Sequence, residues 1–432
     1  MICENLGINT EGILTFAGRD VTELAKKYKT PLYLMDEERI RHNCRVYVNA
    51  MKKHFGENAL ALFASKAASF KQIYRIVREE GMGVDVVSAG ELYTAISAGF
   101  PAENIYFHGS NKTDSEIEYA VKSGTGYFVA DNLEEISAID DFAGAAGICK
   151  KVLLRITPGI DPHTYAAVAT GKVDSKFGFA IATGAAEEAV KFTLSKSNIE
   201  LCGIHCHVGS QVFDSDVYFK TSDIMLEFAA LIEEKFSTHI KILNLGGGYG
   251  VRYVESDPVI DIASNIEMVA KKVKTKCSEL GICVPAVRME PGRSIVADAG
   301  MTLYTVGSVK KIPAYKNYVS VDGGMGDNPR YALYGSKYTV ALANKMNEER
   351  NFLCTLAGRC CESGDIIQEE VLLPLNVERG DIVAVMTTGA YNYSMSSNYN
   401  RVPKPPIVIL DKISEYVAVK RETLEDIIRN DI

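Results

Sequence analysis

The chain has 432 residues, 10 cysteines and a net charge of -8 at neutral pH, with 47% hydrophobic and 24% charged residues. This composition is that of an ordinary globular protein, its length exceeds that of a single-core domain, and its acidic balance argues against nucleic acid or an anionic membrane as a partner. No apolar stretch reaches the roughly 18 residues of a membrane span and no secretory signal opens the chain, so we expect reduced thiols and a cytoplasmic location.

Short apolar runs alternate with segments of helical spacing along the first two thirds of the chain. The predicted strands are 59–64, 84–87, 105–107, 127–130, 152–156, 204–208, 242–245 and 286–289. The predicted helices are 71–80, 91–98, 114–122, 133–139, 183–191, 217–236 and 265–280. This alternation predicts an α/β fold, a (β/α)8 TIM barrel of parallel strands over residues 35–290.

The pattern changes after about residue 295. β-rich runs separated by Gly- and Pro-containing turns occur at 302–309, 318–321, 338–342, 352–357 and 382–386. They predict a second, mostly antiparallel β domain. A short predicted strand at 13–16 is a candidate to pair with this domain, so we assign residues 1–34 and 291–432 to it.

Chemically capable residues gather at the ends of the predicted barrel strands. They are Lys66, Asp85, Ser88, His108, Gly109, Arg155, His205, His207, Gly246, Gly247, Gly248, Glu290, Gly292 and Arg293. Active sites of such barrels form at the carboxyl ends of the strands, so this concentration indicates an enzyme.

Lys66 follows the first barrel strand, where a solvated lysine is the ordinary structural explanation. The functional alternative is a desolvated amine that forms a Schiff base. The run Gly246, Gly247, Gly248 does not have the spacing of a dinucleotide fingerprint. It lies after the seventh strand, where barrels often bind phosphate.

His205 and His207 are spaced to face the same side of a strand. Such a pair can bind metal, but a metal site needs further ligands, and a ring packed on a cofactor is the alternative we favour. A carboxylate at Glu290 suits a pyridine nitrogen, which it would keep protonated. Arg293 and Arg330 are candidates to bind a substrate carboxylate through a bidentate fork.

Six motifs together carry a resemblance to a known family. They are ASKA, HCHVGSQ, NLGGGYG, EPGR, NPRYALYG and CESGD, in this order from about Pro31 to near the C-terminus. They resemble those of diaminopimelate decarboxylases, which are barrel-type, alanine racemase-like enzymes that use pyridoxal 5'-phosphate. The resemblance implies a homodimer with shared active sites. It also implies decarboxylation of meso-2,6-diaminopimelate to L-lysine and CO2, the last step of lysine biosynthesis.

The same resemblance assigns roles to individual residues. Lys66 would carry the cofactor as a Schiff base, His207 would stack on its ring, and Cys361 of the partner chain would donate a proton. The cofactor contacts would be Lys66, His207, Ser210, Gly246, Gly247, Gly248, Glu290, Gly292, Arg293 and Tyr391. The substrate contacts would be Arg293, Arg330, Tyr334, Tyr391 and the partner chain's Glu362. Tyr165 departs from the family pattern, because relatives often carry another histidine there.

Several alternatives stay open. A sister decarboxylase would act on D-lysine, D-ornithine, L-ornithine, arginine or carboxynorspermidine, since specificity turns on a few pocket residues. An amino-acid racemase would avoid a protonated ring nitrogen. Glu290, which would keep that nitrogen protonated, therefore argues against a racemase. A non-catalytic cofactor-binding protein would not need the second domain with CESGD. A metal-dependent hydrolase would need more ligands than the strand ends supply.

Overall fold

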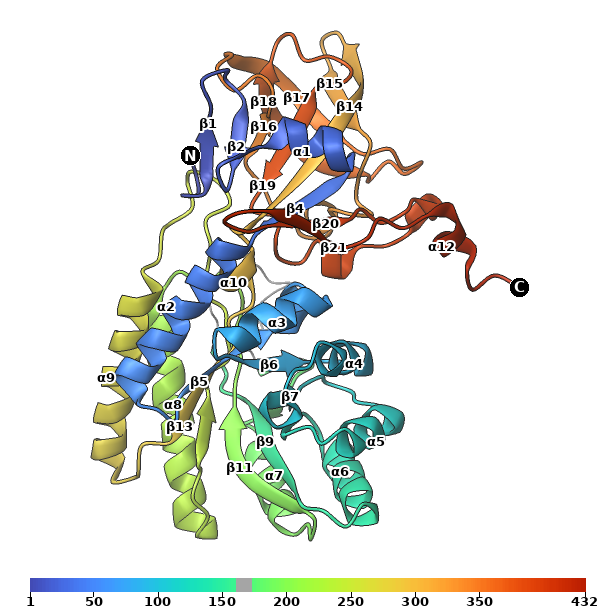
Figure 1. Cartoon of the computed structure of the whole chain (residues 1–432). Coiled ribbons are helices and arrows are strands. Elements are labelled where there is room, and N and C mark those ends of the chain that lie inside the picture. The colour runs from blue at the N-terminus through green and yellow to red at the C-terminus, as the bar shows by residue number, and fades with distance from the viewer. Residues whose placement is uncertain (161–172) are drawn as a thin grey trace. The chain divides into compact units, whose positions relative to one another are not determined.

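The computed structural model describes residues 1–160 and 173–432, so Tyr165 lies outside the described residues. The chain forms two compact units, each built from separate stretches of sequence (Figure 1). One unit contains residues 43–250 and 259–292, and the other contains residues 1–42, 251–258 and 293–432. None of the helices in the described part of the chain combines the length and apolar composition that a bilayer crossing requires.

The first unit is a closed barrel of eight parallel strands (Figure 1). The strands are β5 (Leu60–Ala64), β6 (Gly83–Val86), β7 (Ile105–Phe107), β8 (Tyr127–Ala130), β9 (Lys150–Thr157), β11 (Ile199–His205), β12 (Ile242–Asn244) and β13 (Ala286–Met289). A short β10 (Phe179–Ala180) pairs with β9 outside the ring. Pairing of β8 with β9 and of β13 with β5 closes the ring, which confirms the predicted TIM barrel.

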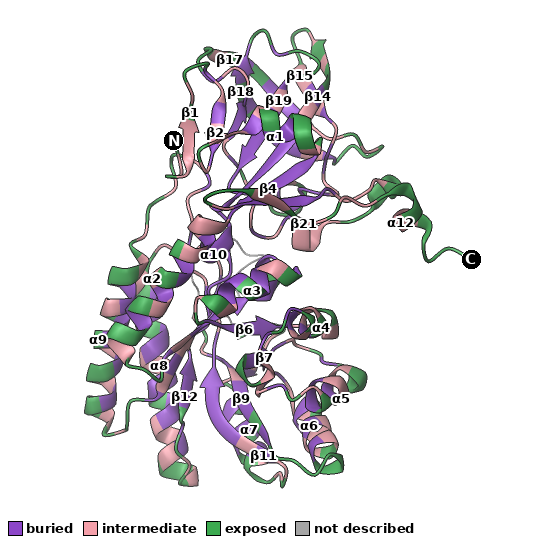
Figure 2. Cartoon of the chain, viewed as in Figure 1, coloured by how far each residue is buried: buried purple, intermediate pink, exposed green. Residues whose placement is uncertain are grey.

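Helices surround the barrel, and their exposed residues lie on the side away from the strands (Figure 2). They are α2 (Glu37–Phe55), α3 (Lys71–Glu79), α4 (Ala89–Ser97), α5 (Asp114–Lys122), α6 (Leu133–Ala145), α7 (Ala185–Leu194), α8 (Ser215–Phe236) and α9 (Ile262–Leu280). Side chains from the strands fill the barrel interior, including Leu62, Leu153 and Ile242. The barrel is therefore a packed core, and only its strand ends are free for chemistry.

The strand register places polar residues at one level of the barrel. His205 pairs with Arg155 on one side and with Asn244 on the other, and each residue stands at or near the carboxyl end of its strand. A bulge at Cys202 shifts the register of β11 just before this level. The strand begins at Ile199, earlier than the predicted residue 204, and ends at His205, so His207 lies beyond it.

The second unit contains a mostly antiparallel sheet, as predicted (Figure 1). Its strands are β4 (Leu32–Asp36), β14 (Gly300–Ile312), β15 (Lys316–Val321), β16 (Val340–Leu342), β17 (Arg350–Ala357), β18 (Ile366–Pro374), β19 (Ile382–Met386), β20 (Ile407–Leu410) and β21 (Glu415–Val419). Its helices are α1 (Val21–Tyr28), α10 (Arg293–Val296), α11 (Arg330–Tyr334) and α12 (Leu424–Ile428). The strands β4, β18, β20 and β21 were not among the predicted ones.

The N-terminal strand pairs differently from the expectation. Strand β2 (Leu14–Phe16) forms a small separate sheet with β1 (Leu6–Ile8) and β3 (Arg19–Asp20). Leu14 and Phe16 nevertheless belong to the same buried apolar cluster as Met301 and Leu303 of β14. Burial ties this segment to the β unit, and so do two backbone hydrogen bonds, from Leu14 N to Ala343 O at 2.8 Å and from Met346 N to Gly12 O at 3.0 Å.

The loop from 358 to 365 is held from within by one buried carboxylate. Asp365 accepts hydrogen bonds from Met325 N and from Cys360 N, each at 2.6 Å. A Cβ at Gly324 or at Gly358 would lie 2.4 or 2.3 Å from an oxygen of this carboxylate, so both positions require glycine. Asp365 thereby fixes the segment that carries the CESGD motif.

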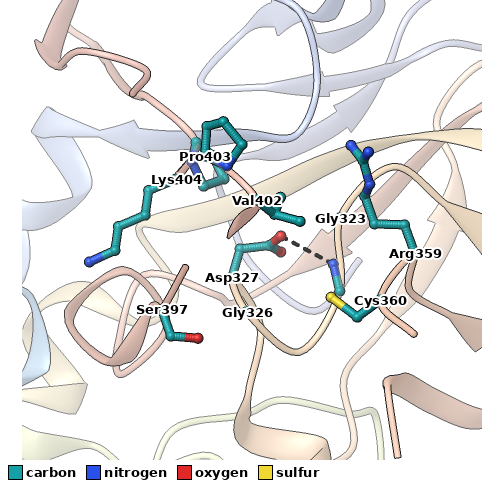
Figure 3. A pocket seen from close by; sticks show the side chains of 11 residues that line it. Gly323, Gly326, Asp327, Arg359, Cys360, Ser397, Val402, Pro403 and Lys404 are labelled. Carbon is teal, nitrogen blue, oxygen red and sulfur yellow. Dashed lines mark hydrogen bonds between the residues drawn. The ribbon is translucent and has the colours of Figure 1, made fainter. Parts of the chain in front are cut away.

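A pocket opens beside this loop, and the Asp327 side chain lies at its wall (Figure 3). The Tyr304 hydroxyl and Gly324 N both donate to this carboxyl group, and the second distance is 3.1 Å. Burial raises the pKa of Asp327 to about 7. The side chain is thus largely uncharged in the folded chain on the acidic side of neutral pH.

We predict that Asp327 makes the protein less stable as pH rises through neutrality. The folded chain keeps a proton that the unfolded chain releases near its ordinary pKa of 3.8. This contribution is therefore fully present below that pH and lost as pH rises through about 7. The free energy of unfolding in urea, measured across this range, should fall more steeply for the wild type than for Asp327→Asn. Parallel curves would contradict the prediction.

Candidate active site

Lys66 follows β5 in a single 3-10 turn, Ser65–Ala67. Ser65 Oγ donates to Glu91 Oε2 at 2.8 Å, and the same oxygen accepts from Val87 N at 2.8 Å. These bonds fix the turn that carries the lysine. The Lys66 side chain is exposed in the single chain, so the expected desolvation of its amine is not provided by the described residues.

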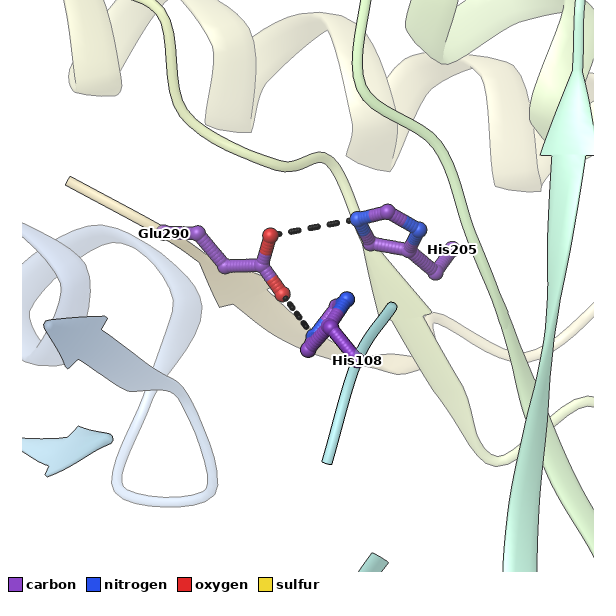
Figure 4. A group of neighbouring side chains, drawn as sticks. All are labelled: His108, His205 and Glu290. Carbon is purple, nitrogen blue, oxygen red and sulfur yellow. Dashed lines mark hydrogen bonds and ion pairs between the residues drawn. The ribbon is translucent and has the colours of Figure 1, made fainter. Parts of the chain in front are cut away.

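The Glu290 carboxylate, just beyond β13, is the centre of a buried polar group (Figure 4). Its Oε1 lies 2.8 Å from His108 Nε2 and accepts from Asn244 Nδ2 at 2.6 Å. Its Oε2 lies 3.1 Å from His205 Nε2. Three side chains from three different strand ends therefore converge on one carboxylate.

The electrostatics of this group keep Glu290 charged. Burial by itself raises the pKa of the Glu290 carboxyl, but the neighbouring His108 and His205 outweigh burial and hold this pKa well below its ordinary value. Burial lowers the pKa of His205 to about 4, so its ring is neutral at pH 7 and can donate one N–H. The result is an ionised carboxylate with a fixed orientation in a buried site.

His108, His205 and Glu290 are also residue types that bind metal ions, and their ligand atoms lie within 4.8 Å of one another. The ring nitrogens of both histidines also lie within ion-pair distance of the Glu290 oxygens. Among the described residues, this group contains His205 together with His108 and does not include His207.

The loop after β12 carries three consecutive glycines against neighbouring backbone. A Cβ at Gly247 would lie 2.1 Å from the Glu290 carbonyl oxygen, and one at Gly248 would lie 2.4 Å from that of Gly209. Gly246 and Gly248 also have φ of +67° and +119°. The loop is thus closely packed backbone without side chains, and a glycine run of this kind allows a phosphate group to approach the backbone N–H groups.

His207 and Ser210 lie in the loop after β11. Gly247 N donates to His207 Nδ1 at 3.3 Å, so this nitrogen acts as an acceptor and the half-buried ring is held beside the glycine loop. A planar ring in that place fits a flat cofactor. A Cβ at Gly292 would lie 3.0 Å from Ala64 Cβ, so this glycine allows close packing beside β5.

The other strand-end residues have structural partners. Ser88 caps helix α4 by accepting from Glu91 N at 3.2 Å. Gly109 has a φ of +117°. The Arg155 guanidinium lies 4.1 Å from the centre of the Phe177 ring. Burial raises the pKa of Asp85, although the nearby His108 acts in the opposite direction.

The β unit contains a buried arginine surrounded by phenols. Arg330 Nη1 donates to the Tyr338 hydroxyl at 2.8 Å, and Nη2 donates to Ser336 Oγ at 3.2 Å. The guanidinium carbon lies 4.7 Å from the centre of the Tyr253 ring. Arg330 is 4% exposed, and it forms no ion pair within the described part of the chain. A buried cation without a carboxylate is costly, so this site is suited to an anionic ligand.

A second arginine of this unit shares the same aromatic neighbour. Arg293 Nη1 donates to the Tyr253 hydroxyl at 2.8 Å. Its guanidinium carbon lies 4.7 Å from the centre of the Tyr391 ring. Tyr391 has a φ of +60°, a strained value for this residue type that its surroundings must impose. The structure thus brings two of the predicted residues, Arg293 and Arg330, to Tyr253, which the sequence analysis missed, and places the predicted Tyr391 beside Arg293.

The remaining predicted residues of the β unit are at its surface. Tyr334, at the end of α11, is 37% exposed. Cys361 and Glu362 are exposed, and Cys361 N donates to Asn400 Oδ1 at 2.7 Å. The Tyr399 hydroxyl lies 3.5 Å from Glu362 Oε2. Their backbone is fixed while their side chains face outward.

Asn244, Tyr253 and Tyr338 are site residues that sequence reasoning missed. Asn244 immediately precedes the glycine run in NLGGGYG, and its place at a strand end was the available signal. Tyr253 follows the same run in GVRYV, where an aromatic residue has no distinguishing pattern.

Comparison with known proteins agrees with this geometry. Residues 39–297 match the family model described as the pyridoxal binding domain of pyridoxal-dependent decarboxylases. The chain is 44% identical to the diaminopimelate decarboxylase of Bacillus subtilis, an alignment that covers 98% of this chain and 96% of that protein. It is 43% identical to the Staphylococcus aureus enzyme of the same name, with 98% of each chain covered. The crystal structure of M. jannaschii diaminopimelate decarboxylase in complex with L-lysine superposes with a TM-score of 0.91 at 32% identity, covering 99% of this chain and 98% of that one.

Proposed function

Because the chain belongs to the diaminopimelate decarboxylase family of pyridoxal-dependent enzymes, we propose that it decarboxylates meso-2,6-diaminopimelate to L-lysine and CO2. The observation that carries the choice of substrate is the buried Arg330, which has no carboxylate partner within the described part of the chain. A substrate with a second carboxylate, away from the reacting carbon, provides that partner.

The barrel residues would hold the cofactor. When bound, pyridoxal phosphate supplies the electron sink that accepts the electron pair left by the departing carboxylate. Lys66 would bind it covalently, and the loop of Gly246, Gly247 and Gly248 would receive its phosphate together with Ser210, Gly292, Arg293 and Tyr391. His207 would pack on the ring. Glu290 would hold a proton on the pyridine nitrogen, because its carboxylate is ionised in the free chain.

The β-unit residues would recognise the substrate and complete the reaction. Arg293 and Arg330 would bind the far carboxylate, with Tyr334 and Tyr391 beside it. Glu362 would bind the far ammonium group. Cys361 would return a proton to the α-carbon through its thiol. We propose that Cys361 and Glu362 serve the partner chain's site in a homodimer, which their exposure in the single chain supports.

We also propose a cytoplasmic location. None of the ten cysteines, all of which are among the described residues, is joined in a disulfide, and the proposed role of Cys361 requires a reduced thiol.

We predict that meso-diaminopimelate is the preferred substrate. Lysine and ornithine lack the far carboxylate and would leave a buried arginine unpaired, at a cost of about 1–3 kcal/mol, or about tenfold to a few hundredfold in kcat/KM. The test compares CO2 release from meso-diaminopimelate, D-lysine, D-ornithine and L-ornithine, with Lys66→Ala as the inactive control. If any of the other three amino acids has a higher kcat/KM than meso-diaminopimelate, the proposal is wrong and the protein is a sister decarboxylase.

We predict that two inactive variants restore activity when mixed. If Lys66 and Cys361 serve one site from two chains, a mixed dimer of Lys66→Ala and Cys361→Ala contains one site with both defects and one with neither. Random exchange of subunits should then recover about a quarter of the wild-type activity per site, because half of the dimers are mixed and half of their sites are intact. Subunit exchange is followed independently with fluorescent labels, and exchange without recovered activity would place both residues in one chain's site.

A further inference from the structure

Tyr253 contacts both arginines of the β unit. Its hydroxyl accepts from Arg293 Nη1 at 2.8 Å, and the face of its ring lies 4.7 Å from the guanidinium carbon of Arg330. The side chain is buried. One tyrosine thus contacts one guanidinium through a hydrogen bond and the other through its π face.

The backbone of Tyr253 is fixed by its own loop and by a neighbouring segment. Asp257 Oδ2 accepts from Tyr253 N at 2.8 Å and from Val254 N at 3.1 Å. The carbonyl oxygen of Tyr253 accepts from Thr339 N at 3.1 Å and from Thr339 Oγ1 at 2.9 Å. The position of the Tyr253 backbone is therefore set by these hydrogen bonds and not by its contacts with the two arginines.

A second tyrosine completes the support on the Arg330 side only. The Tyr338 hydroxyl accepts from Arg330 Nη1 at 2.8 Å, and its ring meets that of Tyr253 edge to face, with centroids 5.5 Å apart. Asn392 Nδ2 lies 3.3 Å from the Tyr338 hydroxyl and donates to Thr388 O at 3.0 Å. Tyr338 serves one arginine, whereas Tyr253 serves both.

We propose that Tyr253 is a positioning residue that sets the relative placement of Arg293 and Arg330, and thereby the selectivity for a ligand that carries a carboxylate. The inference rests on the proposed function, in which these two arginines bind the far carboxylate of the substrate. The hydroxyl groups of Tyr253 and Tyr338 and the face of the Tyr253 ring orient these guanidinium groups. Phenols do not neutralise a guanidinium as a carboxylate would, so Arg330, which forms no ion pair within the described residues, remains available to an incoming anion.

The experiment uses two probes that differ in one group. L-Lysine carries a carboxylate, and cadaverine is the same diamine without it. Inhibition constants of both are measured with the holoenzyme for wild type, Tyr253→Phe, Tyr253→Leu and Tyr338→Phe. Tyr315→Phe serves as the matched control, because Tyr315 is 89% exposed and outside the cluster.

Each substitution has a distinct expected effect. Tyr253→Phe removes the hydrogen bond to Arg293 but keeps the ring beside Arg330, so the inhibition constant of L-lysine should rise about threefold to tenfold. Tyr253→Leu also removes the π face and should raise it about tenfold to a hundredfold. Tyr338→Phe should act on Arg330 alone and resemble Tyr253→Phe in size. The inhibition constant of cadaverine should stay within about twofold in all of them.

Two results would overturn the proposal. An unchanged inhibition constant of L-lysine in Tyr253→Phe and Tyr253→Leu would show that Tyr253 does not position the arginines. An equal loss for L-lysine and cadaverine would show a merely structural role. If Tyr253→Leu does not fold, Tyr253→Phe alone decides between these outcomes.

Failure of the proposed function would give a different pattern. Arg330→Gln removes the guanidinium itself. It should raise the inhibition constant of L-lysine at least as much as Tyr253→Leu does. If Arg330→Gln leaves the L-lysine constant unchanged, the assignment of Arg330 to the carboxylate is wrong, whatever the Tyr253 variants show. If Arg330→Gln raises the inhibition constant of L-lysine and the Tyr253 variants do not, only the proposed positioning role of Tyr253 is wrong.

Discussion

The barrel site depends on keeping one carboxylate charged while it is buried. Removing an ionised carboxylate from water is expensive unless donors replace the lost hydration. Glu290 receives such replacement from Asn244 and His205 through hydrogen bonds and from the adjacent His108. The strand register that aligns His205 with Asn244 is what brings these donors to the same level. The barrel therefore positions the donors that stabilise the charge of Glu290, and in our proposal this charge keeps the pyridine nitrogen of the cofactor protonated.

The β unit uses the opposite charge in a different way. Arg330 is buried among hydroxyl groups and aromatic faces, and the described residues offer it no carboxylate. The guanidinium is oriented but not neutralised. Such a group binds an anionic ligand more strongly than an arginine that already has an ion-pair partner, because no existing pair must be broken. In the barrel, the Glu290 carboxylate has hydrogen-bond donors around it. In the β unit, Arg330 has no carboxylate partner among the described residues.

Much of this organisation could be predicted from the sequence. The periodic apolar runs predicted the barrel and the mostly antiparallel β domain, and the fold class is confirmed. Ordinary chain periodicity does not reveal a bulge, so the early start of β11 and the position of His207 beyond its end were missed. The predicted strand at 13–16 exists as β2, but its buried apolar residues could not show that its ladder partners would be the neighbouring β1 and β3.

The site was predictable to the extent that its residues carry recognisable chemistry. Glu290, His205 and the glycine run stand at strand ends, where position alone makes them informative. Asn244 and Tyr253 act through residues distant in sequence, and their types are common in any core. The roles of Lys66, Cys361 and Glu362 remain proposals, since their side chains are exposed in the single chain.

The central claim is that the ionised Glu290 keeps the cofactor ring protonated, and the most direct measurement is the nuclear magnetic resonance shift of the pyridine nitrogen in isotopically labelled pyridoxal phosphate. The shift is recorded for the wild type and for Glu290→Gln, which keeps the shape of the side chain but removes its charge. We expect a protonated nitrogen in the wild type near neutral pH and an unprotonated one in the variant. A nitrogen that is unprotonated in the wild type, or equally protonated in both proteins, would contradict the account.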